Sequence, residues 1–304
     1  MPNLFCFGLG YTAQCYIVEW GSHFDRIAGT VREAEKAARI AHDGLGGKEI
    51  DAVAFDGARA PPAIAGKLAE SDCLLVSVPP DASGDPVLRC YADVLARSPR
   101  LNAVVYLSTI GVYGDHGGAW VDETTEPTPI SERSRARLEA ERAWAALAAR
   151  TDKTVAILRL SGIYGPGRNA LVQVARLTAK RIVKPGQVFN RIHADDIGTA
   201  IDAAFVRRAG GIVNVADDQP APPQDVVAFA AGLLGLAPPP EIPFAQAAKT
   251  MTAISLSFFC ENKRVRNTKM KRELGLEPLR LPTYREGLRA LFAAGDHLCV
   301  TPRA

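Results

Sequence analysis

Short apolar segments that alternate with longer helical patterns constrain the fold of this chain more than any other feature. Segments rich in Val, Ile, Leu and Phe occupy residues 3–8, 26–31, 51–56, 73–78, 103–109, 155–161 and 211–217. Such alternation is typical of parallel strands joined by crossover helices. Because the segments are continuously apolar, we expect both faces of the sheet to be covered. The prediction is an α/β protein with a doubly wound parallel sheet, that is, a Rossmann fold.

The regular pattern loosens after residue 165. Beyond it lie the segment GRNALVQVARL, the proline cluster APPPEIP and a basic segment that begins KRVRNTKMKREL. We predict a Rossmann domain over residues 1–165 and a smaller, mostly helical C-terminal lobe over residues 166–304. Elements near residues 193–217 have the character of the first domain, so we expect the two parts to interleave there.

Composition and charge argue against several classes of protein. The chain has 304 residues, 47% of them hydrophobic and 23% charged, with a formal net charge of +3. These values are ordinary for a globular protein and give no reason to expect a nucleic-acid or membrane partner. No apolar run approaches the ~20 residues that cross a bilayer, and the N-terminus does not resemble a signal peptide, so we expect a cytoplasmic protein. Neither the six cysteines nor the five histidines show metal-ligand spacing, so we expect no metal site.

The segment GLGYTA, residues 8–13, follows the first apolar segment directly and begins a helical pattern. Gly8 permits a tight turn, Gly10 lets the backbone approach a diphosphate, and the small Ala13 allows helix and strand to pack closely. The first amides of the helix, including those of Tyr11 and Thr12, would then face the negative charge. In this strand–turn–helix context the motif predicts that the domain over residues 1–165 binds a dinucleotide.

The end of the second apolar segment bears on the choice of dinucleotide. NAD proteins usually carry an acidic residue about 20 positions beyond the glycines, whereas this chain has Thr30 there and Arg32 just after it. A guanidinium can pair with the additional 2′-phosphate of NADP, so we favour NADP(H) over NAD(H). The alternative is that Arg32 is simply a solvated surface residue. We expect Asp56 and Gly57 to reach the adenine. The fourth segment ends with Ser77 and Val78 and is followed by Pro79, and we expect these residues to lie along the nicotinamide side of the diphosphate.

Five segments together resemble the extended short-chain dehydrogenase/reductase family, which includes nucleotide-sugar epimerases and dehydratases. They are GLGYTA, YLSTIGVYG, RLSGIYGPGR, RIHADDIGTAI and KRVRNTKMKRELGLEP, in the family's order over nearly the whole chain. More narrowly, the chain is similar to an atypical bacterial subgroup of NAD(P)-binding, epimerase-like proteins. The resemblance implies that Thr109 is the family's catalytic Ser/Thr and that Ser108, Arg137 and Ile163 contact the cofactor. Dimers built through two helices are common in the family, so the resemblance allows a homodimer.

The chain departs from the family at two positions that carry acid–base chemistry. Aligning RLEAE with the family's Lys-Leu-x-x-Glu pattern puts Arg137 at the catalytic lysine and Arg133 at the catalytic tyrosine. Arginine has a pKa above about 12 and no acceptor, so it cannot serve as a base. The two arginines are one helical turn apart, and we expect them near the nicotinamide ribose, where they can bind a carboxylate or phosphate. The alternative is a solvated helix stabilised by its glutamates, Glu132, Glu139 and Glu141.

If the protein is an enzyme, another side chain must exchange the proton. Tyr113, in the segment VYG, is expected at a strand end that faces the cleft and is the candidate acid–base group. His116, which follows in a glycine-containing loop, is a second candidate. We assign the substrate contacts to Arg133, Tyr164 and Arg168.

Two main hypotheses about function remain open at this point, beside a third option, a metabolic enzyme that uses a bound nicotinamide only transiently. The first is an NADP(H)-dependent oxidoreductase or epimerase with a non-standard acid–base group, acting on a small molecule in a cleft between the lobes. The second is a non-catalytic NADP(H)-binding redox sensor or regulatory protein, since losing both the tyrosine and the lysine removes the family's proton relay. We favour the enzyme, because a sizeable second lobe has little purpose in a sensor.

Overall fold

Seven parallel strands form the main sheet of the computed structural model, which describes residues 1–298. In spatial order they are β11 (Gly211–Val215), β7 (Thr154–Leu160), β5 (Ala103–Thr109), β4 (Cys73–Val76), β1 (Leu4–Phe7), β2 (Ile27–Val31) and β3 (Asp51–Ala54). Each overlaps one of the seven predicted segments, with β7 beginning one residue earlier than predicted, and all neighbouring pairs run parallel. The predicted fold class, a doubly wound parallel α/β sheet, is therefore confirmed.

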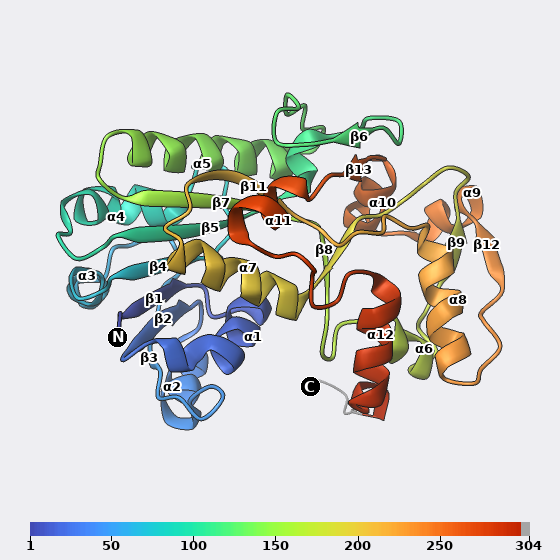
Figure 1. The fold of residues 1–304 in the computed structure, drawn as a ribbon, viewed down its shortest axis with the longest axis horizontal. Coiled ribbons are helices and arrows are strands. Elements are labelled where there is room, and N and C mark those ends of the chain that lie inside the picture. Colours follow the sequence, from blue (N-terminus) through green and yellow to red (C-terminus); the bar gives the residue numbers. More distant parts are fainter. Residues whose placement is uncertain (299–304) are drawn as a thin grey trace.

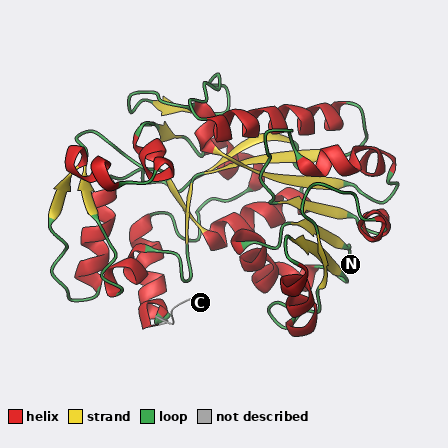
Figure 2. Cartoon of the chain, turned by 180° about the vertical axis from the view of Figure 1, so that it is seen from behind, coloured by secondary structure: helices red, strands yellow, loops and turns green. Residues whose placement is uncertain are grey.

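Helices cover both faces of this sheet (Figure 1), and Figure 2 shows the strands lying between the two helical layers. One face carries α1 (Tyr11–Trp20), α2 (Ala34–Asp43), α7 (Ala194–Val206) and α11 (Thr268–Leu274). The other carries α3 (Pro62–Ala69), α4 (Pro86–Arg97) and α5 (Glu132–Ala149). Leu4 and Cys6 pack into the first layer, whereas Phe5 and Phe7 pack into the second. Because both faces are buried in this way, the strands are continuously apolar.

Helix α5 packs one face on the sheet although its sequence is largely polar. Ser131 caps its N-terminus by accepting a hydrogen bond from the amide of Ser134. Trp144 and Leu147 are fully buried, and the indole N–H of Trp144 donates a 3.1 Å hydrogen bond to Asp85, the N-cap residue of α4. These contacts fix α5 beside the sheet and determine where its first turns lie.

The remaining elements form a smaller lobe at one end of the sheet, on the right in Figure 1. Its helices are α6 (Ala170–Ala175), α8 (Pro223–Leu233), α9 (Phe244–Ala247), α10 (Ala253–Phe259) and α12 (Tyr284–Ala293). Short parallel ladders that the sequence did not predict join β8 (Gly162–Tyr164) to β10 (Arg191–His193), β9 (Arg181–Val183) to β12 (Glu241–Pro243), and β6 (Trp120–Val121) to β13 (Arg264–Val265). α7, β11 and α11 return to the main sheet after residue 166. The domain boundary at 165 stays our proposal.

Candidate active site

The turn between β1 and α1 has the backbone geometry that a bound diphosphate requires. Gly8 has a φ of +92°, and a Cβ there would lie 3.0 Å from Cγ1 of Val78. The space where a Cβ of Gly10 would point is open, with no other part of the chain within 4 Å. Gly10 precedes α1 and has no side chain to cap it, so the first amides of the helix are free to bind an anion. The residues present therefore fit the diphosphate of a dinucleotide.

Thr30 supports this turn and does not face a ligand. It is only 1% exposed, and its hydroxyl oxygen accepts a 3.0 Å hydrogen bond from the amide of Gly8. Its carbonyl oxygen accepts a second hydrogen bond, of 2.7 Å, from the amide of Leu9. The prediction that Thr30 contacts the cofactor is therefore wrong, because a buried hydroxyl already engaged by the backbone cannot reach a ligand.

The ends of β2 and β3 lie side by side near the turn, with Val31 paired to Ala54. Arg32 follows β2 directly, is exposed, and makes no ion pair or hydrogen bond within the described residues. Asp56 is also exposed, and a 2.8 Å hydrogen bond from the amide of Ala58 holds the pKa of its carboxyl below the usual value. A free guanidinium and an ionised carboxylate are thus both available beside the turn.

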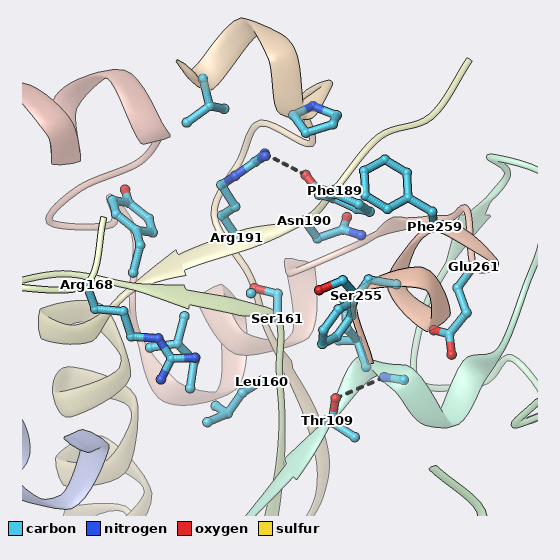
Figure 3. Close-up of a pocket in the computed structure, with 18 of the residues that line it drawn as sticks. Thr109, Leu160, Ser161, Arg168, Phe189, Asn190, Arg191, Ser255, Phe259 and Glu261 are labelled. Atoms are coloured by element: carbon cyan, nitrogen blue, oxygen red, sulfur yellow. Dashed lines mark hydrogen bonds between the residues drawn. The ribbon is translucent and has the colours of Figure 1, made fainter. Parts of the chain in front are cut away.

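A cavity of about 980 Å³ extends from the start of α1 to the smaller lobe. It lies at the carboxyl ends of β4, β5 and β7, where ligands bind in doubly wound sheets. Figure 3 shows Thr109 and Arg191 on opposite sides of it, with Ser161 between them. The predicted residues that line it are Thr12, Ser77, Ser108, Thr109, Arg133, Arg137, Ile163, Tyr164 and Arg168. The predicted cofactor residues outside it lie at the glycine turn or just beyond β2, β3 and β4: Gly8, Gly10, Tyr11, Ala13, Arg32, Asp56, Gly57, Val78 and Pro79.

Thr109 ends β5 and stands half-buried at the wall of the cavity. Its hydroxyl oxygen accepts a 3.1 Å hydrogen bond from the amide of Gly111, at the start of the 3₁₀ turn Ile110–Tyr113. A hydroxyl that accepts one hydrogen bond still has its own hydrogen to donate. Thr109 can therefore donate a hydrogen bond to an oxygen atom of a ligand in the cavity.

Tyr113, by contrast, is fully buried and does not line the cavity. Its hydroxyl donates a 2.8 Å hydrogen bond to Oδ1 of Asn214, and the guanidinium of Arg159 lies 4.7 Å from the centre of its ring. Burial raises the pKa of Tyr113 above its ordinary value. The prediction that Tyr113 exchanges a proton with a substrate is therefore wrong. His116 also lies outside the cavity lining, with Nε2 3.0 Å from the carbonyl oxygen of Tyr113.

The two arginines at the start of α5 both line the cavity but have different surroundings. Nη1 of Arg137 donates hydrogen bonds of 3.0 Å to the hydroxyl of Tyr106 and to the carbonyl oxygen of Leu107. Arg133 is exposed, and its guanidinium lies over the ring of Phe258 in α10, 5.2 Å from the ring centre. Neither arginine forms an ion pair within residues 1–298.

The glutamates of α5 have other partners. Glu139 pairs with Arg142 at the surface, at 2.7 Å. Glu141 is buried and pairs with Arg159, whose Nη2 lies 2.7 Å from Oε2, and it also accepts the hydroxyl hydrogen of Ser108. The alternative interpretation was that the helix carrying Arg133 and Arg137 is solvated and stabilised by its glutamates. For Glu141, which is buried, that interpretation is wrong.

The lining of the cavity is strongly cationic. Its positively charged side chains are Arg133, Arg137, Arg168, Lys180, Arg191 and Lys263. The acidic lining residue is Glu261, with Oε2 2.6 Å from Nζ of Lys263. Burial lowers the pKa of Lys263, which also donates to the carbonyl oxygen of Gly114. The other five cations form no ion pair within residues 1–298. Arg191 interacts electrostatically with the buried Asp217, and Arg137 with Asp85, but the positive charge of the lining exceeds its negative charge, so the cavity favours an anionic ligand. No motif in the sequence marked Glu261 and Lys263 as site residues, because only the fold places their segment against the cavity.

Two further predicted residues connect the cavity to the glycine turn. The guanidinium of Arg168 lies over the ring of Tyr11, 5.6 Å from its centre, and the Tyr11 hydroxyl donates to the carbonyl oxygen of Pro166 at 3.1 Å. Tyr164 is buried, and its hydroxyl donates to the carbonyl oxygen of Thr283 at 3.4 Å. Because burial raises the pKa of Tyr164, its hydroxyl acts as a hydrogen-bond donor and not as a base.

Within residues 1–298, no three or more His, Cys, Asp or Glu side chains form a group that could hold a metal ion. Cys299 lies outside the described residues. None of the described helices has the length and apolar character needed to span a membrane.

Comparison with known families and solved structures supports this description. The sequence model of the NAD-dependent epimerase/dehydratase family matches residues 91–216. A structure of a functionally unknown conserved protein from Silicibacter pomeroyi is 42% identical and has a TM-score of 0.84, covering 97% of this chain and 99% of that one. A structure from Methylobacillus flagellatus, described as a candidate NAD-dependent epimerase/dehydratase, is 25% identical with a TM-score of 0.72. It covers 97% of this chain and 98% of the other.

Curated relatives match over shorter stretches. Protein YeeZ of Escherichia coli K12 is 32% identical over 181 residues, which are 57% of this chain and 62% of that protein. A 3-diazoavenalumate denitrifying reductase from a Streptomyces species is 31% identical over 160 residues, 51% of each chain. The chain thus spans between half and two thirds of the length of these curated relatives.

Proposed function

The chain belongs to the NAD-dependent epimerase/dehydratase family, and on that premise we propose that it is an NADP(H)-dependent oxidoreductase or epimerase of a small molecule. The observation that carries this proposal is that one cavity reaches from Thr12, in the first turn of α1, to Thr109 and the smaller lobe. A dinucleotide with its diphosphate at the start of α1 would have its nicotinamide and a substrate in the same space.

The chain's own residues assign places to the parts of this cofactor. Gly8, Gly10 and the first amides of α1 would bind the diphosphate, and Ala13 leaves room for the helix to pack close by. We assign Arg168 to the diphosphate as well, because its guanidinium already lies on Tyr11 in the first turn of α1. The adenine would lie near Asp56 and Gly57, and the nicotinamide near Ser77, Val78, Pro79, Ser108, Arg137 and Ile163.

The preference for NADP(H) over NAD(H) rests on Arg32. This side chain follows β2 directly, is exposed and has no partner within the described residues. A free guanidinium at that place can bind the 2′-phosphate through two parallel hydrogen bonds. The ribose hydroxyl of NAD offers it no charge, so NADP(H) should bind more tightly.

The reaction must proceed without the family's tyrosine. The bound nicotinamide supplies a hydride donor or acceptor. Thr109 would donate a hydrogen bond to the oxygen of the reacting carbonyl or hydroxyl, and Arg137 would stabilise negative charge that develops there. Neither arginine can release its proton near neutral pH. Since Tyr113 is out of reach, we propose that solvent water in the cavity exchanges the proton.

The test is a titration of the purified protein with NADPH, NADP⁺, NADH and NAD⁺ by calorimetry, followed by a panel of carbonyl and hydroxyl compounds. We expect binding of NADPH and turnover visible in nicotinamide absorbance. Thr109→Val should lower kcat by at least about tenfold, the size of one catalytic hydrogen bond, with NADPH affinity unchanged. Absence of nucleotide binding would overturn the proposal.

One observation favours a second candidate, a non-catalytic NADP(H)-binding redox sensor. Arg133 and Arg137 replace both members of the family's proton relay, and Arg137 is bonded to the sheet through Tyr106 and Leu107. A sensor requires that NADPH and NADP⁺ bind with different affinities and change the binding of a partner. Turnover of any substrate in the panel favours the enzyme, whereas an affinity difference without turnover favours the sensor.

We also propose a cytoplasmic location and a homodimer, with neither nucleic acid nor membrane as a partner. The formal net charge of +3 is too small to attract either polyanionic surface strongly. Cell fractionation and light scattering of the purified protein measure location and oligomeric state.

A further inference from the structure

The guanidinium of Arg133 has a defined position in the cavity but no hydrogen-bond acceptor within the described residues. Its Cζ lies over the ring of Phe258, 5.2 Å from the ring centre, and this ring is itself 53% exposed. A cation–π contact uses the charge of a guanidinium and leaves its N–H groups free to donate hydrogen bonds. Arg133 therefore presents unused hydrogen-bond donors to the cavity.

Arg137 presents further donors one turn along the same helix. A single nitrogen, Nη1, makes both of its hydrogen bonds, to Tyr106 and to the carbonyl oxygen of Leu107. Nε and Nη2 have no acceptor within residues 1–298. Leu107 precedes Thr109 by two residues in β5, so the bond to its carbonyl oxygen holds the guanidinium near the end of that strand. The hydroxyl of Thr109 can donate a hydrogen bond to a ligand there.

Neither of these two arginines would form an ion pair with a dinucleotide bound as proposed. The proposed diphosphate position would neutralise Arg168, which lies on Tyr11 at the start of α1. Arg191 donates to the carbonyl oxygens of Phe189 and Ala221. Neither Arg133 nor Arg137 forms an ion pair within residues 1–298 or has an evident cofactor phosphate; Arg137 interacts electrostatically with Asp85, whereas no acidic group is recorded beside Arg133. Four residues apart in a helix, the two arginines share one side and can together bind a small anion.

We propose that Arg133 and Arg137 bind an acid group of the substrate, a carboxylate or a phosphate, beside the carbonyl or hydroxyl that reacts at Thr109. The inference rests on the proposed function and names its substrate class: short oxo or hydroxy acids, or their phosphorylated equivalents. In the reducing direction the carbonyl carbon gains the hydride of the reduced nicotinamide dinucleotide, and its oxygen gains a proton from water. The dinucleotide leaves oxidised, and both arginines keep their protons.

Anion binding is measured first, by calorimetry on the full-length protein without nucleotide, with oxalate and inorganic phosphate as probes. We expect wild type to bind at least one of them and Arg133→Gln to bind it about 10- to 100-fold more weakly, the effect of losing a charged hydrogen-bonding partner. Arg133→Lys, which keeps the charge but not the planar fork, should be intermediate. Arg142→Gln is the matched control on the exposed side of α5 and should bind like wild type.

The ratio of oxalate to phosphate affinity identifies the acid group as carboxylate or phosphate. Equal affinities in wild type and Arg133→Gln, or no binding of either anion to wild type, would overturn the inference. NADPH affinity of Arg133→Gln should stay within about twofold of wild type. If the wild-type protein did not bind NADPH, the proposed function would be overturned instead. Failure of the inference and failure of the proposed function therefore give different results.

Turnover gives the second readout. With NADPH, 2-oxo acids or phosphorylated ketones should be reduced with at least about tenfold higher kcat/KM than uncharged ketones of the same length, and Arg133→Gln should remove that preference. A wild-type enzyme that prefers uncharged ketones, or a preference that survives in Arg133→Gln, would contradict the assignment.

Discussion

Arg32→Ala should weaken the binding of NADPH while leaving the binding of NADH nearly unchanged. Arg32 follows β2, is exposed and has no partner within the described residues, so its removal breaks no contact inside the protein. The fold and the glycine turn should be intact in the variant. The only interaction expected to be lost is the one with the 2′-phosphate, which NADH does not carry.

The structure limits the size of this effect. A hydrogen bond to a charged group contributes about 1.5–3 kcal/mol, and exposure to water and salt reduces the contribution of an ion pair. For the exposed Arg32 we therefore expect a loss of about 1–2 kcal/mol in NADPH binding. At about 1.4 kcal/mol for each factor of ten, this is roughly a 5- to 30-fold increase in Kd. The increase should shrink at high ionic strength.

Calorimetric titration of wild type and variant with NADPH and NADH measures both affinities. Arg39→Ala is the matched control, because Arg39 is an exposed arginine on α2 without a partner in the described chain. It should bind both nucleotides like wild type. If Arg32→Ala weakened NADPH and NADH equally, or neither, the reasoning that assigns the 2′-phosphate to Arg32 would be refuted.

Three further predictions concern stability. Burial raises the pKa of Asp217 to about 8, against roughly 3.9 in an unfolded chain. The protonated carboxyl group therefore contributes its full share to the free energy of unfolding below about pH 4, and this share is lost as pH rises towards 8. Asp217→Asn should therefore flatten the fall of Tm over that range; an unchanged slope would contradict this. Glu141→Gln leaves the buried Arg159 without its counter-ion and should lower the free energy of unfolding in urea by about 3–5 kcal/mol, and a loss below about 1 kcal/mol would show that water replaces the pair. Gly8→Ala should lower Tm and abolish nucleotide binding, while Gly47→Ala, also at positive φ but with open space around the new methyl group, should cost stability alone.

Local sequence patterns were sufficient to predict the main sheet and the glycine turn. The apolar segment before Gly8 and the helical pattern after Gly10 are contiguous, so the strand–turn–helix unit is encoded within about 20 residues. Thr109 was singled out by the resemblance to the short-chain dehydrogenase/reductase family, and the structure places it at the end of β5 in the cavity lining. Parallel strands bring such ends to one edge, whatever the details of packing.

The residues that the sequence misassigned are those whose partners lie far along the chain. Tyr113 hydrogen-bonds Asn214 across 101 residues, and Thr30 bonds Gly8 across 22. Each side chain is polar and stands near a strand end, so the sequence alone suggests that it faces a ligand. Only the packing reveals that a buried neighbour already satisfies it.

By itself, the sequence determined the class of fold and the place of the glycine turn, because hydrophobic period and glycine conformation act between near neighbours. The tertiary structure decided which polar groups stay available. It buried Glu141 against Arg159, a residue of another element, yet left Arg133 without an acid. Whether a charge is neutralised depends on which distant side chain the fold brings within a few ångströms of it, and no local pattern encodes that distance.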